Sequence, residues 1–440
     1  MNRKMIIQAI FSALQGPLNC PQLSAFHEHA RLNEDLYLDS VLLLQLLLTL
    51  ELELGIDIPD SALSNEDFIT VSSLTDFLLN QSADKTDTPE TQLTVEFDDI
   101  KVHCFVSCLC EMIKADDRVD HRPFYFGVWD AQVLINQHHQ LSYHSAHIKH
   151  DFFMTWYEKL YSVPVIAWYR PYQNKTQNIA TLEKLIKYKT ASQHVMVMLD
   201  MYLLPERENK FNQNPFPHYV MLEQTEDQDQ WFMYDPDFRW EGLQAKSQVL
   251  AAIGSDAVAG GYYFDSKYIR PSSDQAIHDY FLACLNLESN PMTNLVRQII
   301  ELHTSENMSE SQRQSIKDLP EALSQLSVLA IRKYAYEHGL AFFWRALKLE
   351  DAEFEYWCDV IEELVSTYKK IQYRVLKIAN DGISNNLKKG LLAQIYELLH
   401  QQDQREFKIK ARLQAVFEQW KQQAQLNTTS QHIQSAQASL

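Results

Sequence analysis

The front of the chain carries apolar residues at helical spacing. Over residues 1–11 the apolar residues would lie on one face of a helix and the polar residues on the other, which predicts an amphipathic helix. The strongly apolar residues 40–54 predict a second helix, which Gly55 ends. A shorter helix is expected over residues 71–80. Together these elements predict a small helical domain over residues 1–80.

A polar stretch follows, and we place a linker over residues 81–94 because its first part has no periodicity and almost no apolar residue. Beyond it the pattern is mixed. Residues 102–113 have helical spacing, and short apolar or alternating runs predict strands at residues 163–169, 195–199, 219–224 and 231–235. Residues 95–270 are therefore expected to form an α+β domain.

Helical spacing returns in the last part of the chain. Residues 274–424 contain only three glycines and predict a helical bundle, and the polar residues 425–440 predict a flexible tail. The sequence thus predicts a multidomain protein of the α and α+β classes.

Charge narrows the choice of partners. Lys and Arg number 39 against 58 Asp and Glu, a net charge of −19, which excludes nucleic acid as a partner of the whole molecule. Residues 1–90 hold four basic and fourteen acidic residues, a charge of −10. This acidic front domain is expected to bind partners that carry positive charge. Glycine is scarce, at 10 residues, and no phosphate-binding loop motif occurs.

The chain shows no sign of a membrane or secreted protein. Its longest apolar run, residues 41–50, is about half of the ~20 residues that a membrane span needs. Six cysteines are too few for a disulfide scaffold and lack the paired spacing of zinc sites. We therefore expect a cytoplasmic protein without a membrane span.

Asp39 and Ser40 open the second helix of the front domain. An isolated Asp-Ser is most simply a helix cap. A phosphate on Ser40 would, however, meet the free N–H groups and the positive end of the helix. The length, acidity and order of motifs of this domain resemble an acyl carrier protein. That resemblance implies a four-helix bundle with 4′-phosphopantetheine attached to Ser40, and as partners a phosphopantetheinyl transferase and an acyl-loading enzyme (an adenylating ligase or synthetase).

Cys104 lies at the start of the first helix of the α+β domain. The positive end of a helix stabilises a thiolate, as a cysteine nucleophile requires. A buried small apolar residue is the alternative interpretation. Cys108 and Cys110 are rival nucleophiles, but they lie further into the helix, where the effect of its end fades.

His218 and Asp235 lie on two strands expected to form a hairpin that turns near residues 226–227. Because both are equidistant from this turn, we expect them to lie side by side. An Asp beside a His fixes its tautomer and supports its charged form, so Cys104, His218 and Asp235 follow the order of a papain-like triad. A surface His and an Asp-Pro turn are the alternative.

Several motifs in the same order resemble the N-terminal domain of the BtrH-type acyltransferases of butirosin biosynthesis: residues 103–109, 124–129, 195–205 and 218–236. The resemblance covers residues 95–265, and the later helices are similar to the C-terminal region of those enzymes. It implies a papain-like domain that moves an acyl group from a carrier protein to a small-molecule amine acceptor. One departure is that Asp98 and Asp99 stand where papain-like enzymes have a glutamine before the nucleophile.

Histidines cluster between residues 138 and 150, and His147 and Asp151 would share a helical face. A polar surface helix explains them equally well, and we expect no bound metal.

The combined hypothesis is a carrier protein fused to an acyltransferase of secondary metabolite or siderophore biosynthesis. A thioesterase would use the same three residues with water as the acceptor. A non-catalytic carrier and docking scaffold is the alternative from another class.

Overall fold

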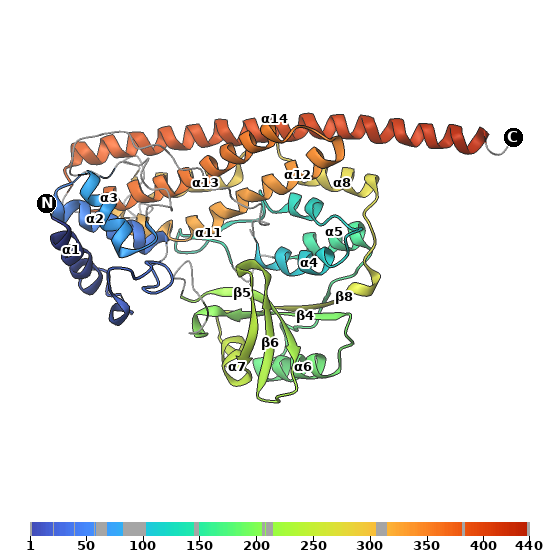
Figure 1. The fold of residues 1–440 in the computed structure, drawn as a ribbon, viewed down its shortest axis with the longest axis horizontal. Helices are drawn as coiled ribbons and strands as arrows, with labels where there is room; N and C mark the ends of the chain where they lie inside the picture. The colour runs from blue at the N-terminus through green and yellow to red at the C-terminus, as the bar shows by residue number, and fades with distance from the viewer. Residues whose placement is uncertain are drawn as a thin grey trace.

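The computed structural model describes residues 2–20, 22–38, 40–56, 58, 68–81, 103–144, 149–204, 207, 214–304, 315–380 and 383–437. Figure 1 shows a helical domain at the N-terminus, a sheet domain, and a long helical region that extends over both. The α and α+β fold class and the multidomain organisation are confirmed. The predicted linker from residue 82 onward lies outside the described residues.

The described part of the N-terminal domain contains three α-helices and one short 3-10 helix: α1 (Arg3–Gln15), η1 (Leu23–Ala25), α2 (Ser40–Leu54) and α3 (Val71–Gln81). Asn2 caps α1 by accepting a hydrogen bond from the Met5 N–H. The chain leaves α2 at Gly55, whose φ of 65° lies in the left-handed region that favours glycine. Leucines and isoleucines of the three helices form a core of their own.

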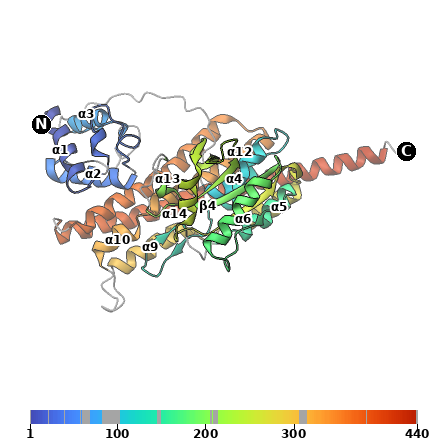
Figure 2. The same cartoon turned by 90° about the horizontal axis from the view of Figure 1, so that it is seen from below.

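The N-terminal domain packs against α13 (Asp351–Ala379) of the helical region, and Figures 1 and 2 both show the two side by side. Tyr373 and Leu376 of α13 join the apolar core of the N-terminal domain. Lys377 pairs with Glu51 of α2 at 2.8 Å, and the Tyr373 hydroxyl donates to the same carboxylate. In the described part of this contact, one ion pair, one hydrogen bond and the buried side chains of Tyr373 and Leu376 thus hold α2 on α13.

A six-stranded antiparallel sheet forms the centre of the second domain, in the order β3-β8-β4-β5-β6-β7. Its strands are β3 (Ile166–Ala167), β4 (Gln193–Asp200), β5 (Pro217–Gln224), β6 (Gln230–Asp235), β7 (Trp240–Ala245) and β8 (Gly261–Asp265). A separate small hairpin pairs β1 (Leu134–Ile135) with β2 (Leu141–Ser142).

Helices cover both faces of this sheet. In Figure 1, α4 (Cys104–Lys114) and α5 (Asp151–Tyr161) lie on one face, and α6 (Lys175–Tyr188) and α7 (Lys246–Gly254) on the other. Successive side chains of β4 alternate between the two cores: Met196 and Met198 join the core of α4, whereas Val195 and Val197 join that of α6 and α7. Burial on both faces explains why β4 and β5 read as nearly continuous apolar runs in the sequence.

Three of the four predicted strands lie within β4, β5 and β6. The fourth prediction, residues 163–169, is too long, because only Ile166 and Ala167 pair with β8. Neither β7 nor β8 is predicted from the sequence. β7 is an edge strand in which only one residue is buried, so it lacks the apolar signal of a buried strand.

The C-terminal region is helical, as predicted, with α8 (Asp274–Cys284), α9 (Pro291–Thr304), α10 (Leu319–Ala322), α11 (Leu326–Ala330), η9 (Ile331–Tyr334), α12 (Ala335–Leu347), α13 and α14 (Asn385–Gln437). Where the sequence predicts a flexible tail from residue 425, α14 continues as helix and projects past the rest of the molecule in Figure 1. No glycine or proline follows Gly390, so nothing in the sequence ends this helix.

A cluster of buried charges joins the sheet domain to the helical region. Lys333 of η9 pairs with Asp130 at 2.9 Å and with Glu406 of α14 at 2.5 Å. Lys410, one turn after Glu406, reaches the other oxygen of Asp130 at 2.8 Å. Lys333 is 1% exposed, Glu406 and Lys410 0%. The Tyr336 hydroxyl adds a hydrogen bond to Glu406 at 2.8 Å.

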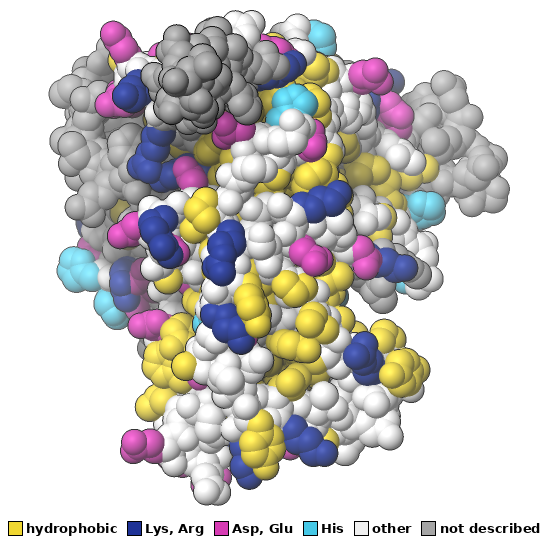
Figure 3. Space-filling view, turned by 90° about the vertical axis from the view of Figure 1, so that its right-hand side faces the viewer, with side chains coloured by type: hydrophobic (Ala, Val, Ile, Leu, Met, Phe, Trp, Pro, Cys, Tyr) yellow, Lys and Arg dark blue, Asp and Glu magenta, His cyan; other side chains and the backbone are white. Residues whose placement is uncertain are grey.

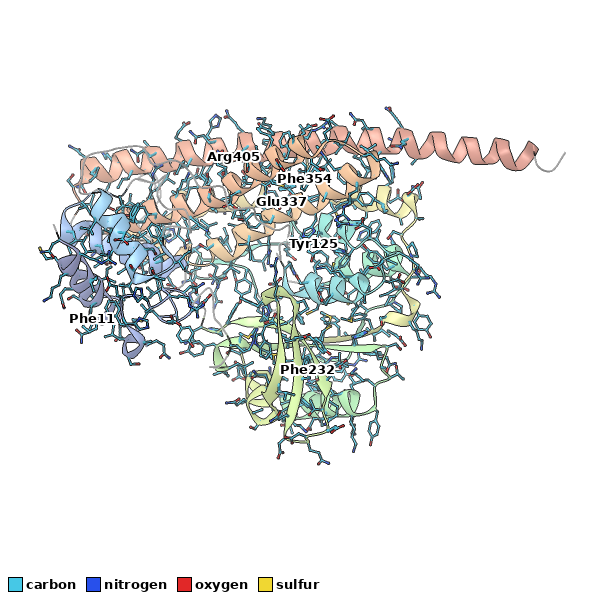
Figure 4. All side chains as sticks on the ribbon, viewed as in Figure 1. Phe11, Tyr125, Phe232, Glu337, Phe354 and Arg405 are labelled. Atoms are coloured by element: carbon cyan, nitrogen blue, oxygen red, sulfur yellow. The ribbon has the colours of Figure 1, made fainter. Side chains whose placement is uncertain are left out.

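Further contacts between the elements include aromatic stacking and an ion pair near the surface. Figure 4 labels Tyr125, whose ring stacks on His338 of α12 at a centroid distance of 3.9 Å, and Arg405 of α14, which pairs with Glu363 of α13 at 2.6 Å. On the face shown in Figure 3, basic and acidic side chains are interspersed, and apolar side chains gather in the lower part of the view.

Removing one buried charge is expected to destabilise the protein strongly. Lys333→Met leaves Glu406 without its 2.5 Å cation in an apolar core, which should cost about 3–5 kcal/mol of unfolding free energy. Urea denaturation of the full chain measures this change. The control Arg118→Ala, which breaks an exposed pair with Asp116, should change stability by about 0–1 kcal/mol. Equal effects of the two substitutions would contradict the conclusion that the buried charges of this cluster depend on one another.

Reversing one charge at the contact between α2 and α13 is expected to release the N-terminal domain. Lys377→Glu places a carboxylate against Glu51, and like charges at an interface cost several kcal/mol. Hydrogen–deuterium exchange of the α13 segment around Tyr373 should therefore rise. The double variant Glu51→Lys with Lys377→Glu restores an opposite pair and should return exchange toward that of the wild type; failure to do so would argue against a specific ion pair.

Candidate active site

Cys104 is the first residue of α4, and its thiol lies at the positive end of that helix. The residue before it, His103, is the N-cap and has an extended backbone. The following residues, Phe105, Val106 and Cys108, are buried and pack the helix into the core beside β5. The packing of α4 thus fixes its first turn, whereas Cys104 itself is only partly buried.

His218 of β5 and Asp235 at the end of β6 are brought together, with 2.8 Å between His218 Nε2 and Asp235 Oδ1. The predicted register is wrong by two residues. Met221 pairs with Tyr234, so Asp235 lies nearly opposite residue 220 rather than opposite His218. The turn centres one residue later than predicted. An even shift keeps both side chains on the same face, so they still meet diagonally across the two strands.

Arg207 completes the surroundings of Asp235, and sequence reasoning missed it. Its guanidinium donates to Asp235 Oδ2 at 2.6 Å and lies over the Trp240 ring at 3.7 Å. Both oxygens of Asp235 are therefore engaged, one by His218 and one by Arg207. Arg207 precedes Asp235 by 28 residues, and no local pattern in the sequence marks it.

The electrostatics favour a charged histidine. Burial lowers the pKa of His218, but the adjacent Asp235 carboxylate and hydrogen bonding with Cys104 outweigh it and raise this pKa well above 6.5. Burial raises the pKa of Asp235, but His218 and Arg207 outweigh this and hold it below its ordinary value. Because Asp235 occupies Nε2, the other ring nitrogen of His218 is the one that remains for the thiol.

Asp237 links the two halves of the site and was also missed. It accepts a hydrogen bond from the Ser107 hydroxyl at 2.7 Å and another from the backbone N–H of His103. Burial raises its pKa in spite of these bonds. Asp237 thereby ties the short helix after Asp235 to the first turn of α4. The only signal in the sequence is its place two residues after Asp235.

A pocket opens in front of these residues. Its walls come from both parts of the chain: Cys104, His218, Tyr219, Phe238 and neighbouring residues from the sheet domain, and Val328, Ile331 and Arg332 from the helical region. The lining is mostly aromatic and aliphatic. Arg332 was not predicted as a site residue, because nothing in the sequence connects a helical segment to a site over 200 residues earlier.

The rival cysteines lie in the protein core and do not line this pocket. The Cys108 thiol faces the Tyr219 carbonyl at 3.5 Å, and burial raises its pKa well above the usual range. Cys110 is also fully buried, with its thiol toward the His121 carbonyl. Of the three cysteines of α4, Cys104 alone combines partial exposure with a place in the pocket.

The histidine cluster is not the predicted surface helix. His138 and His139 lie in the turn between β1 and β2, and His150 stacks on the Phe105 ring at 4.1 Å. α5 begins only at Asp151, and His147 lies outside the described residues. Among the residues that the structure describes, no group of three or more His, Cys, Asp or Glu side chains is arranged to hold a metal ion.

Ser40 is the first residue of α2, as predicted, but the description does not extend to its side chain or to Asp39. Asp98 and Asp99 also lie outside the described residues. No described helix is long and apolar enough to cross a membrane.

Comparison with known proteins identifies most of the chain. Residues 99–269 match the model of the DUF6005 N-terminal domain, and residues 275–434 match that of the DUF6005 C-terminal domain. The chain belongs to the DUF6005 family. The boundary between the two matched domains falls just before α8, so the pocket lies between the two domains of the family.

Two curated relatives come from Bacillus anthracis. Petrobactin synthase is 42% identical over 323 residues, which cover 73% of this chain and 96% of that protein. Acyl carrier protein AsbD is 32% identical over 78 residues, which cover 18% of this chain and 86% of that protein. This DUF6005 chain is therefore similar to two separate proteins of one organism.

Asp235→Asn is expected to lower the pKa of His218, because it removes the carboxylate charge that raises this pKa above 6.5. The NMR titration midpoint of the His218 ring should move to lower pH. Any reaction that uses this histidine should slow by about 10²–10⁴-fold, as for other His-Asp pairs. Asp279→Asn, on the surface of α8, is the matched control and should change neither the His218 titration midpoint nor the reaction rate. An unchanged His218 titration would contradict the geometry.

Proposed function

We propose that this chain is a carrier protein fused to an acyltransferase of siderophore biosynthesis. It would move an acyl group from a phosphopantetheine thioester on Ser40, through an acyl-enzyme on Cys104, to an amine acceptor. The observation that carries the proposal is that Cys104, at a helix N-terminus, lines one pocket together with His218, which Asp235 orients. The two relatives, a petrobactin synthase and an acyl carrier protein, support both parts of the fusion.

The position of Ser40 fits the attachment of phosphopantetheine. Ser40 begins α2, and the free N–H groups at a helix start favour a phosphate. When bound, the group would supply a thiol that carries the acyl group as a thioester. Loading it requires a phosphopantetheinyl transferase and then an adenylating ligase or synthetase, which are the partners we propose.

The first half of the reaction transfers the acyl group to the enzyme. The Cys104 thiolate attacks the acyl carbon and forms a new C–S bond. The bond from the acyl carbon to the donor sulfur breaks, and His218 gives its proton to that sulfur. A raised His218 pKa suits this step, because the ring then carries a proton at neutral pH.

The second half passes the acyl group to the acceptor. His218, now neutral, takes a proton from the amine as its nitrogen attacks the acyl carbon on Cys104. The C–S bond breaks, an amide leaves, and the charged pair of Cys104 and His218 is restored. Asp235 keeps the ring in place throughout, and Arg207 holds Asp235. If water took the place of the amine, the same residues would form a thioesterase.

The test uses full-length protein acylated on Ser40 and incubated with and without candidate amines. Mass spectrometry is expected to show an amide product with the wild type, and at least about 10³-fold less with Cys104→Ala although Ser40 remains loaded. Ser40→Ala should lose the reaction with its own carrier but regain transfer from free acylated pantetheine, since its Cys104 site is intact.

Three other outcomes would overturn the proposal. Free acid as the product with every amine would indicate a thioesterase. Full turnover by Cys104→Ala would indicate a carrier and docking scaffold without this chemistry. Absence of a pantetheine mass increment on Ser40 in protein from the native host would contradict the carrier assignment.

A further inference from the structure

A buried cation from the C-terminal domain faces the pocket of the N-terminal domain. Arg332 lies in η9, lines the pocket together with Cys104 and His218, and is 8% exposed. The proposed chemistry does not use this residue. A charge in such a position is costly to bury unless it interacts with charge of the opposite sign.

Neutral acceptors hold the guanidinium in place. Nη1 donates to the Gln132 carbonyl at 3.2 Å and Nη2 to the Tyr143 carbonyl at 3.3 Å. Among the described residues, no carboxylate pairs with Arg332 within 4 Å. The adjacent Lys333 is locked by Asp130 and Glu406, so η9 itself cannot easily shift. Arg332 is therefore both fixed and free of a direct counter-ion within the described structure.

Arg332 keeps its positive charge, and two neighbouring histidines are neutral. Burial lowers its pKa to about 10, against the opposing effects of Cys104, Tyr143 and Asp237, so it stays charged at neutral pH. Burial is also the main reason why the His150 pKa falls to about 3, and Arg332 adds to that effect. Burial, and then Arg332, also lower the pKa of His103. These two imidazoles are therefore neutral near pH 7 and do not compete for an anion.

We propose that Arg332 supplies a fixed positive charge that stabilises the anionic sulfur of Cys104 and the negative oxygen that develops on the acyl carbon. This inference rests on the proposed function and adds a residue of the C-terminal domain to it. Fixed charge aimed at developing charge, in a site shielded from water, is an effective form of catalysis. It also gives a reason for a pocket between the two domains. The N-terminal domain contributes Cys104 and His218, and the C-terminal domain contributes the positive charge of Arg332.

The test measures the reactivity of Cys104 rather than turnover. The alkylation rate of the Cys104 peptide by iodoacetamide is followed by mass spectrometry in the full chain between pH 5 and 9, with Cys104→Ala as the blank. Arg332→Gln keeps a donor for the carbonyls but loses the charge. It should slow alkylation at pH 6 by about tenfold. Arg332→Lys keeps the charge and should stay within about threefold of the wild type. A profile of Arg332→Gln equal to that of the wild type overturns the inference.

A second measurement needs no substitution and applies if Arg332→Gln does not show a native melting transition. In the wild type, the ratio of the alkylation rates by anionic iodoacetate and neutral iodoacetamide should be severalfold higher at Cys104 than for glutathione. A ratio no higher than that of glutathione overturns the inference. If Cys104→Ala retains turnover, the proposed function fails instead, so the two failures are distinguishable.

Discussion

The buried charges of Lys333, Asp130, Glu406 and Lys410 are the constraint on which the rest of the structure depends. Asp130 belongs to the sheet domain and the other three to the helical region, so Asp130 meets its two buried cations, Lys333 and Lys410, only across the junction between the domains. An uncompensated charge in this core would cost several kcal/mol, a large part of the stability of an ordinary domain. The cluster therefore links the two matched domains of the family through buried ion pairs.

This junction also decides where the pocket lies. Lys333 is fixed by the cluster, and the residue before it faces Cys104. On the other side, Asp237 ties the short helix after Asp235 to the first turn of α4. The thiol, the imidazole and the guanidinium thus come from three elements that are held independently. Preorganisation of this kind lets a site act on developing charge without rearranging first.

The sequence was most informative where the signal is local. Helix starts and strand alternation placed Cys104, His218 and Asp235, and the error of two residues in register did no harm because side chains on a strand repeat every second residue. Arg207, Asp237 and Arg332 carry no such signal. Their contacts span 28 to 200 residues, and Asp237 and Arg332 lie in short 3-10 helices, which give no apolar period to reveal which way a side chain points. The edge strand β7 was missed for a different reason: only one of its residues is buried, so its sequence has no apolar pattern.

The described contact between α2 and α13 rests on few side chains, which suits the proposed carrier role. Glu51, which makes the ion pair, lies 11 residues after Ser40 on the same helix, about three turns away. A carrier on its own chain is always at high effective concentration, so docking does not have to be tight. It must instead be reversible, because the proposed modification and loading of Ser40 require other enzymes to reach the same domain. Among the described residues, Tyr373, Leu376 and the pair of Glu51 with Lys377 hold this orientation, and such a contact can be released, whereas a large apolar interface would hold the proposed carrier against one partner only.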